Sequence, residues 1–312
     1  MYCIGFDIGG TKCAVSLGEI TDNQIKILQR EEVPTSKSPT DTLQRLACHV
    51  KRFQTQKQIT SAGISCGGPL DPEKGVILTP PNLQGWHGFA IVEYIKEQFN
   101  LSATLENDAN ACAVAEWRFG AGMGTKNMVF MTFGTGLGAG LILDGKLYGG
   151  TNGNAGELGH IRLAKNGPIG YGKEGSFEGF CSGGGISKLA VLMAKRRKTM
   201  PKCIQEMGGY EQVTTKKLSI AAFNGDKFAK QVFAKSGEML GKGLSVVIDV
   251  LNPERIVLGG VFMRSSALLI PAMQKQIDKE ALINSAKVCQ IVPAKLSENI
   301  GDVAALSVAK GV

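Results

Sequence analysis

Asp108 is the carboxylate whose neighbours best suit a catalytic base. It lies in the run Glu106-Asn107-Asp108-Ala109-Asn110, between a predicted strand at 103–106 and a predicted helix at 109–119. Asparagine and aspartate are also common caps at the start of a helix, so a purely structural role explains this run equally well. We expect the helix dipole to keep the carboxylate ionised, and such a group could accept a proton from an attacking hydroxyl.

Three glycine-rich turns follow predicted strands and could hold phosphate groups. Glycine lets backbone N–H groups approach an anion closely, while threonine, lysine and aspartate could add a hydroxyl donor, a positive charge and a water-mediated magnesium contact. One such turn is commonly structural, but three favour a nucleotide. The candidate nucleotide residues are Asp7, Gly9, Gly10, Thr11, Lys12, Gly134, Thr135, Gly136, Gly259 and Gly260, with Asp7 as the magnesium contact.

A polar cluster later in the chain could bind vicinal hydroxyl groups. Glu157 and His160 are three residues apart in the run Gly-Glu-Leu-Gly-His, so one helical turn would place them on the same side. Glu178 follows in another glycine-rich stretch. The alternative is a histidine that only satisfies a structural partner.

The hydrophobic pattern predicts alternating strands and helices that would position these residues. We expect an antiparallel meander at the N-terminus and a long helix in the second half. The predicted strands are 2–8, 13–17, 25–33, 59–65, 103–106, 127–133, 137–143, 255–258 and 288–292. The predicted helices are 42–53, 90–99, 109–119, 227–250 and 301–310.

Two segments share one layout and indicate an internal duplication. Residues 6–17 and 132–143 are each a strand, a glycine turn and a second strand, and Gly10 aligns with Gly136. Such a pair predicts two similar domains that face one another across a cleft. We expect a smaller domain from residues 1–106 with about 300–312, and a larger one from 107–299.

The composition is that of a globular protein with two domains. The chain has 312 residues, of which 43% are apolar and 20% charged. Eight scattered cysteines without a CxxC pair, and no signal peptide or membrane span, favour a reducing cytoplasm. The net charge of +8 includes basic runs at 195–198 and 216–217, but no aromatic residues alternate with them. We therefore expect no nucleic-acid partner and no membrane partner.

The chain resembles the ROK family (repressors, open reading frames, kinases) over nearly its whole length. The motifs that carry the resemblance are DIGGTK at 7–12, GGPLD at 67–71, ENDANA at 106–111, the glycines at 134–140, GELGH at 156–160, GSFE at 175–178 and NPERIVLGG at 252–260. Their order and spacing make the match specific, although each motif alone is common.

The resemblance implies an α/β fold of two actin-like domains of the ribonuclease-H type, and an ATP-dependent kinase that phosphorylates the 6-hydroxyl of a hexose. It implies that Asp108 is the base, that ATP and magnesium are used, and that the protein is a homodimer. Glucose is the expected sugar, and N-acetylglucosamine, N-acetylmannosamine or another hexose is the alternative, which would depend on the loop at Asn82. The implied hexose contacts are Gly68, Asn82, Asn107, Asp108, Glu157, His160 and Glu178.

One departure from the family pattern concerns zinc. Most members bind zinc through the histidine of the GH pair and three cysteines. Here those cysteine positions hold Ile169, Tyr171 and Ser176, and the nearby Cys181 with one histidine cannot complete a tetrahedral site. We therefore expect no structural zinc, and a loop held by the packing of Tyr171 and Phe177.

Two other functions compete with a kinase. The family includes sugar-sensing repressors, but these have a helix-turn-helix domain before the first glycine turn, which here begins at residue 7. Asp7 and Asp108 are also retained, which favours catalysis. An actin-like ATPase without a sugar site is disfavoured by the cluster of Glu157, His160 and Glu178.

Overall fold

The computed structural model describes residues 1–22, 24–296 and 300–311. The chain divides into two compact units and contains two five-stranded sheets. Unit 1 comprises Met1–Phe130, Gly140–Ala155 and Ala294–Val312, and unit 2 comprises Met131–Ala139 and Gly156–Pro293. In the described part of the chain, no helix has both the length and the apolar character needed to cross a membrane.

The sheet of unit 1 has the strand order β3-β2-β1-β4-β7. β1 (Tyr2–Ile8), β2 (Lys12–Ile20) and β3 (Ile25–Pro34) form the predicted antiparallel meander. β4 (Ile59–Cys66) and β7 (Ser102–Asn107) then extend the sheet parallel to β1. The carboxyl ends of β1, β4 and β7 therefore lie at the same edge.

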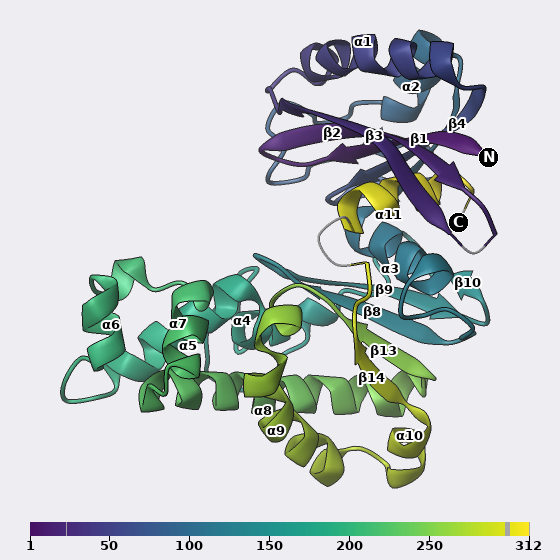
Figure 1. Ribbon diagram of the computed structural model, residues 1–312. Coiled ribbons are helices and arrows are strands. Elements are labelled where there is room, and N and C mark those ends of the chain that lie inside the picture. Colours follow the sequence, from purple (N-terminus) through teal and green to yellow (C-terminus); the bar gives the residue numbers. More distant parts are fainter. Residues whose placement is uncertain (23, 297–299, 312) are drawn as a thin grey trace. The chain divides into compact units, whose positions relative to one another are not determined.

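Helices cover both faces of this sheet (Figure 1). α1 (Pro39–Gln56) buries the predicted stripe Leu43, Leu46, Val50 and Phe53, and it lies on the same side as α2 (Ile91–Phe99). α3 (Asp108–Phe119) and α11 (Ile300–Val308) pack together on the opposite side. The approach of α11 is close, because a Cβ atom at Gly63 would lie 2.0 Å from the carbonyl oxygen of Ala305.

The second sheet has the order β10-β9-β8-β13-β14. Its strands are β8 (Met128–Phe133), β9 (Leu137–Leu143), β10 (Lys146–Leu147), β13 (Arg255–Leu258) and β14 (Gln290–Pro293). The order repeats that of the first sheet, with β8 and β9 in the places of β1 and β2. This repetition agrees with the duplication predicted from the two glycine hairpins.

The helices of unit 2 surround the long α8 (Lys227–Leu251), which packs along α9 (Val261–Glu280). The others are α4 (Phe177–Cys181), α5 (Gly183–Lys195), α6 (Lys202–Met207), α7 (Thr215–Phe223) and α10 (Ile283–Val288). Two small hairpins complete the chain: β5 (Leu70–Asp71) with β6 (Val76–Ile77), and β11 (Ile169–Gly170) with β12 (Lys173–Glu174).

Each predicted element corresponds to an observed one, with boundaries that differ by up to about three residues, but α4, α5, α6, α7, α9 and α10 were not predicted. One boundary near the C-terminus differs in the type of element. The strand predicted at 288–292 begins at Gln290, because Val288 ends α10 and Cys289 caps it. A β-branched residue at a helix end carries the same apolar signal as the first residue of a strand, so the boundary could not be read from the pattern.

Candidate active site

The carboxyl edge of the unit 1 sheet brings together the predicted residues of this unit. In the register of the sheet, Asp7 lies opposite Ser65, and Ser65 opposite Glu106, so the segments after β1, β4 and β7 emerge side by side. Gly68 lies close to Asn107, since a Cβ atom at Gly68 would be 3.1 Å from the Asn107 side-chain nitrogen. In α/β sheets this edge is where ligands usually bind.

The first glycine turn is tight, and a hydrogen bond from outside the turn holds it in place. The Gly9 N–H donates to the Lys12 carbonyl at 3.1 Å, and Thr35, which follows β3, donates its hydroxyl to the Gly9 carbonyl at 2.6 Å. A Cβ atom at Gly10 would lie 2.5 Å from the carbonyl oxygen of Asn82. The turn therefore contacts the loop of Asn82, which contributes a predicted sugar contact.

Asp108 lies at the first position of α3, and its carboxylate accepts the Ala109 N–H at 2.8 Å. Asn107 is the actual N-cap, because its side chain also accepts from the Ala109 N–H. The surrounding protein atoms raise the pKa of Asp108 above the ordinary value of an aspartate, although this backbone hydrogen bond acts in the opposite direction. Two effects therefore oppose one another at this carboxylate, since desolvation raises its pKa and the hydrogen bond at the start of the helix lowers it.

Asp7 is the second carboxylate at this edge. Its pKa is raised from 3.8 to about 6, mainly by burial and then by the charges of Asp302 and Asp108, while Arg30 acts in the opposite direction. Asp302 belongs to α11 and accepts hydrogen bonds from Ser16 at 2.7 Å and Arg30 at 2.8 Å. A cation next to Asp7 would relieve the repulsion between the three carboxylates.

Lys12 turns toward β3. Its ammonium group lies 2.5 Å from Glu32, which also pairs with Arg30 at 2.9 Å. Both bonds lower the pKa of Glu32, with the bond to Lys12 the larger cause. A phosphate contact by Lys12 would therefore compete with this ion pair.

The turn of unit 2 at 134–138 lies against the start of α5. The N–H groups of Gly183 and Gly184 donate to the carbonyls of Gly134 and Thr135, at 2.8 and 3.2 Å. Thr215, at the start of α7, donates its hydroxyl to the Gly183 carbonyl at 2.5 Å. These bonds fix the turn and use two of the N–H groups that begin α5.

Glu178 joins this turn to the predicted sugar residues. Its carboxylate accepts the Leu137 N–H at 3.0 Å, and a Cβ atom at Gly136 would lie 2.7 Å from the same oxygen. The third glycine site is also adjacent: Gly260 has a φ of +66°, and a Cβ atom there would be 2.3 Å from the Phe133 carbonyl. Unit 2 thus gathers the second and third predicted turns with Glu178.

His160 ends the 3₁₀-helix Leu158–His160, and Glu157 is the residue that precedes this helix. Both residues are exposed, and the His160 N–H donates to the Glu157 carbonyl at 3.1 Å. Gly159 between them packs against the Leu137 carbonyl. The 3₁₀ turn is therefore attached to the same hairpin as Glu178.

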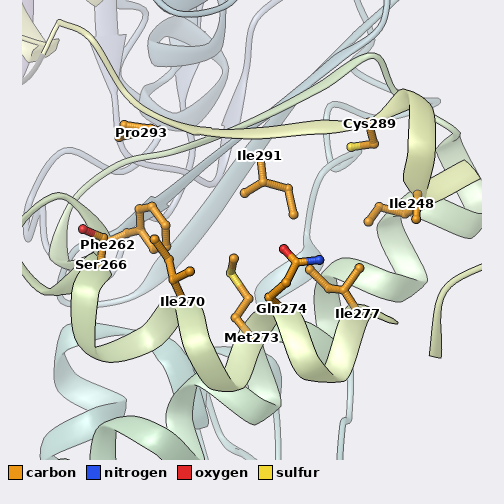
Figure 2. Close-up of a pocket in the computed structure, with 11 residues that line it drawn as sticks. Ile248, Phe262, Ser266, Ile270, Met273, Gln274, Ile277, Cys289, Ile291 and Pro293 are labelled. Atoms are coloured by element: carbon orange, nitrogen blue, oxygen red, sulfur yellow. The ribbon is translucent and has the colours of Figure 1, made fainter. Parts of the chain in front are cut away.

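A separate pocket of about 260 Å³ lies among α8, α9, α10 and β14 (Figure 2). Its lining is largely apolar, with Gln274 and Ser266 as its hydrogen-bonding side chains, and it contains none of the predicted site residues. The lining residues are Ile248, Phe262, Ser266, Ile270, Met273, Gln274, Ile277, Ala286, Cys289, Ile291 and Pro293.

Comparison with known proteins gives the family. The ROK family model matches residues 3–312. The chain belongs to the ROK family. It is 30% identical to the glucokinase of Streptomyces coelicolor, over 98% of this chain and 97% of that protein.

Solved ROK structures have the same fold, which is that of the actin-like ATPases. A ROK family glucokinase from Streptomyces griseus, in complex with glucose and AMPPNP, is 28% identical with a TM-score of 0.79, and all of both chains is covered. A ROK family transcriptional regulator, a homologue of the E. coli MLC protein, is 25% identical with a TM-score of 0.85, over 99% of this chain and 78% of that one. Kinases and regulators are thus both among the similar proteins.

The zinc-binding stretch of other ROK proteins does not fit a metal here. Among the described residues, no three histidine, cysteine or acidic side chains cluster as metal ligands would. The Cys181 thiol is buried and donates to the Ser236 carbonyl, and one cysteine with one histidine does not complete a tetrahedral zinc site. Phe177 is buried as predicted, but Tyr171 is 72% exposed, so its predicted packing role was wrong.

Several residues of this region had no recognisable signal in the sequence. Ser16, Arg30 and Asp302 lie far apart along the chain and meet only in the folded unit 1. Glu116 is fully buried in α3 and accepts the N–H groups of Lys295 and Leu296, the segment that leads toward α11. A lone glutamate on a helix gives no indication of such partners.

Proposed function

We propose that the protein is an ATP-dependent hexose kinase that phosphorylates the 6-hydroxyl group, with glucose as the first substrate to test. The observation that carries the proposal is the carboxyl edge of the unit 1 sheet, where Asp108, Asp7 and the first glycine turn lie together. Phosphoryl transfer requires a carboxylate near the attacking hydroxyl and a frame for the phosphates, and these segments supply both.

In this proposal Asp108 accepts the proton of the hexose 6-hydroxyl. The elevated pKa of its carboxyl makes it a stronger base than an ordinary aspartate, and its bond to the Ala109 N–H fixes one oxygen. The residues proposed to contact the hexose are Gly68, Asn82, Asn107, Glu157, His160 and Glu178. The nucleotide contacts are the three glycine turns.

Magnesium would be held mainly by ATP oxygens and water, with Asp7 as an outer contact. Asp7 suits a hard cation because it lies near the carboxylates of Asp302 and Asp108, and a cation would relieve the repulsion between them. When bound, magnesium neutralises charge that develops on the transferred phosphoryl group.

The test is an ADP-release assay with ATP and magnesium over glucose, mannose, N-acetylglucosamine and N-acetylmannosamine. Turnover with glucose well above the other sugars supports the proposal as stated. A higher rate with an N-acetylated sugar would change the substrate and point to the Asn82 loop.

A non-catalytic sugar sensor is the second candidate, because the chain is also similar to a ROK regulator. Hexose binding by calorimetry without any ADP release would favour the sensor. The homodimer and the cytoplasmic location remain predictions, and size-exclusion chromatography with light scattering tests the dimer.

A further inference from the structure

The segment at 161–176 of unit 2 is closed by its own backbone. The N–H groups of Leu163 and Ala164 donate to the Gly175 carbonyl at 2.9 and 3.2 Å, and the Gly175 N–H donates to the Pro168 carbonyl at 3.1 Å. At its end the Phe177 N–H donates to the Ile161 carbonyl at 2.8 Å. The segment therefore returns to its starting point next to His160.

Ser176 ties this segment to α4. Its side chain is fully buried, and its hydroxyl donates to the Gly170 carbonyl at 3.3 Å and accepts the Gly179 N–H at 3.1 Å. The hydroxyl is thus both the cap of α4, which carries Glu178, and a link to the β11–β12 hairpin. The hairpin approaches closely, since a Cβ atom at Gly170 would be 2.5 Å from the Gly179 nitrogen.

Two aromatic rings anchor α4 in the core of unit 2. The Phe177 ring lies against Gly243 of α8, where a Cβ atom would be 2.2 Å from the ring. The Phe180 ring lies against Gly167 in the 161–176 segment, where a Cβ atom would be 2.3 Å away. Because neither position tolerates a side chain without movement, these contacts hold the segment against α8.

The tip of the β11–β12 hairpin holds His160. Lys173 donates its ammonium group to the His160 carbonyl at 2.8 Å. The Tyr171 ring meets the imidazole edge-on, with ring centroids 6.2 Å apart and an interplanar angle of 78°. Tyr171 has a φ of +44°, a left-handed conformation that is unusual for a tyrosine, although most of its side chain is exposed. Tyr171 therefore contacts His160 and is not buried in the core.

We propose that Ser176 and Tyr171, which stand where other ROK proteins have zinc-binding cysteines, are positioning residues that hold Glu178 and His160 without a metal. The inference rests on the proposed hexose site and adds how this chain orders it. Ser176 orders α4 and hence Glu178, whose carboxylate bonds to the Leu137 N–H. Tyr171 orients the imidazole, and Lys173 fixes the His160 backbone.

The test compares Tyr171→Ala, Tyr171→Phe and Ser176→Ala with the wild type, and Ile169→Ala is the control because Ile169 is an exposed apolar residue of the same hairpin. Glucose affinity is measured by calorimetry without ATP, and kcat at saturating glucose. We expect Tyr171→Ala to weaken glucose binding about fivefold with kcat within about twofold, and Tyr171→Phe to keep the wild-type affinity. Ser176→Ala should weaken binding about tenfold.

A second readout does not depend on the sugar. Hydrogen exchange of the β11–β12 hairpin, followed by mass spectrometry, should be faster in Ser176→Ala and unchanged in Ile169→Ala. Dialysis of the wild type against a chelator should change neither exchange nor glucose affinity, and metal analysis should find no stoichiometric zinc.

Wild-type affinity in both Tyr171→Ala and Ser176→Ala would overturn the inference, as would one zinc per chain whose removal weakens glucose binding. A wild type that binds no hexose would overturn the proposed function instead. In that case, the rate of hydrogen exchange in the β11–β12 hairpin of the Ser176→Ala variant would still show whether the Ser176 hydroxyl holds this hairpin.

Discussion

The two glycine hairpins have the same layout but differ in what surrounds them. In the alignment that places Gly10 on Gly136, Asp7 falls on Phe133 and Lys12 on Gly138. Asp7 lies among Asp108, Asp302 and Arg30, whereas Phe133 is a buried core residue. The turn of unit 1 is thus surrounded by charges, and that of unit 2 by backbone hydrogen bonds from α5.

This difference indicates that the two hairpins have different roles. A turn held by the start of a helix and by one carboxylate is a rigid frame. A turn with a carboxylate of raised pKa and a lysine in an exposed ion pair can change its charge and its contacts when a ligand arrives. We therefore expect changes at Asp7 and Asp108 to alter catalysis and pH dependence, and changes around the turn of unit 2 to alter binding.

The largest effect is expected at Asp108. Asp108→Ala should lower kcat by about 100-fold or more, with little change in hexose affinity, because the substitution removes the proton acceptor and leaves the other contacts. Steady-state kinetics and calorimetry measure the two quantities. A variant with near-normal turnover would remove Asp108 from the role of base.

Asp7 tests the charged surroundings of the first turn. Its pKa is about 6 in the folded protein and 3.8 in an ordinary aspartate. Between these values the folded protein binds more protons than the unfolded chain, so this group's contribution to the free energy of unfolding falls as pH rises. Asp7→Asn should therefore raise the free energy of unfolding by about 2 kcal/mol near pH 8, with no gain near pH 4.

Urea unfolding at several pH values measures the Asp7 effect. Asp144→Asn is the control, since Asp144 is an exposed residue of unit 1 in a left-handed conformation that asparagine also adopts. Equal stability of Asp7→Asn and wild type near pH 8 would contradict the raised pKa.

Glu178 tests the rigid frame of unit 2. Glu178→Ala leaves the Leu137 N–H without its acceptor and should raise the KM values for ATP and hexose about tenfold, while Glu178→Gln keeps an acceptor oxygen and should raise them about threefold. Glu206→Ala, on the exposed side of α6, is the control. If the alanine and glutamine variants behave alike, the bond to Leu137 does not matter for binding.

The smallest effect is expected at Glu32. Glu32→Gln frees Lys12 from its ion pair, and we expect the KM for ATP to fall about twofold at low salt and less at high salt. Glu31→Gln is a matched control, because Glu31 is on the same strand and pairs with Arg52 at 2.7 Å. A higher KM in Glu32→Gln would mean that the ion pair positions Lys12 for phosphate.

The sequence predicted the elements that have strong local patterns, but it did not predict α5, α7 or α9 of unit 2. The stripe of α1, the length of α8 and the two hairpins could each be read from the spacing of apolar residues and glycines. The role of Tyr171 could not, because an aromatic residue in a loop gives the same signal whether it is buried or exposed.

The sequence by itself determined the two glycine hairpins, their duplication and the family motifs, since turns and strand alternation depend on neighbouring residues. Only the tertiary structure decided which charges surround Asp7, which groups hold the second turn, and which partners Ser176 and Tyr171 contact near His160. Asp302, one of the charges near Asp7, also accepts a hydrogen bond from Ser16, which lies 286 positions earlier in the chain. No local sequence pattern predicts such a pair, because the two residues are brought together only by the packing of α11 on the sheet.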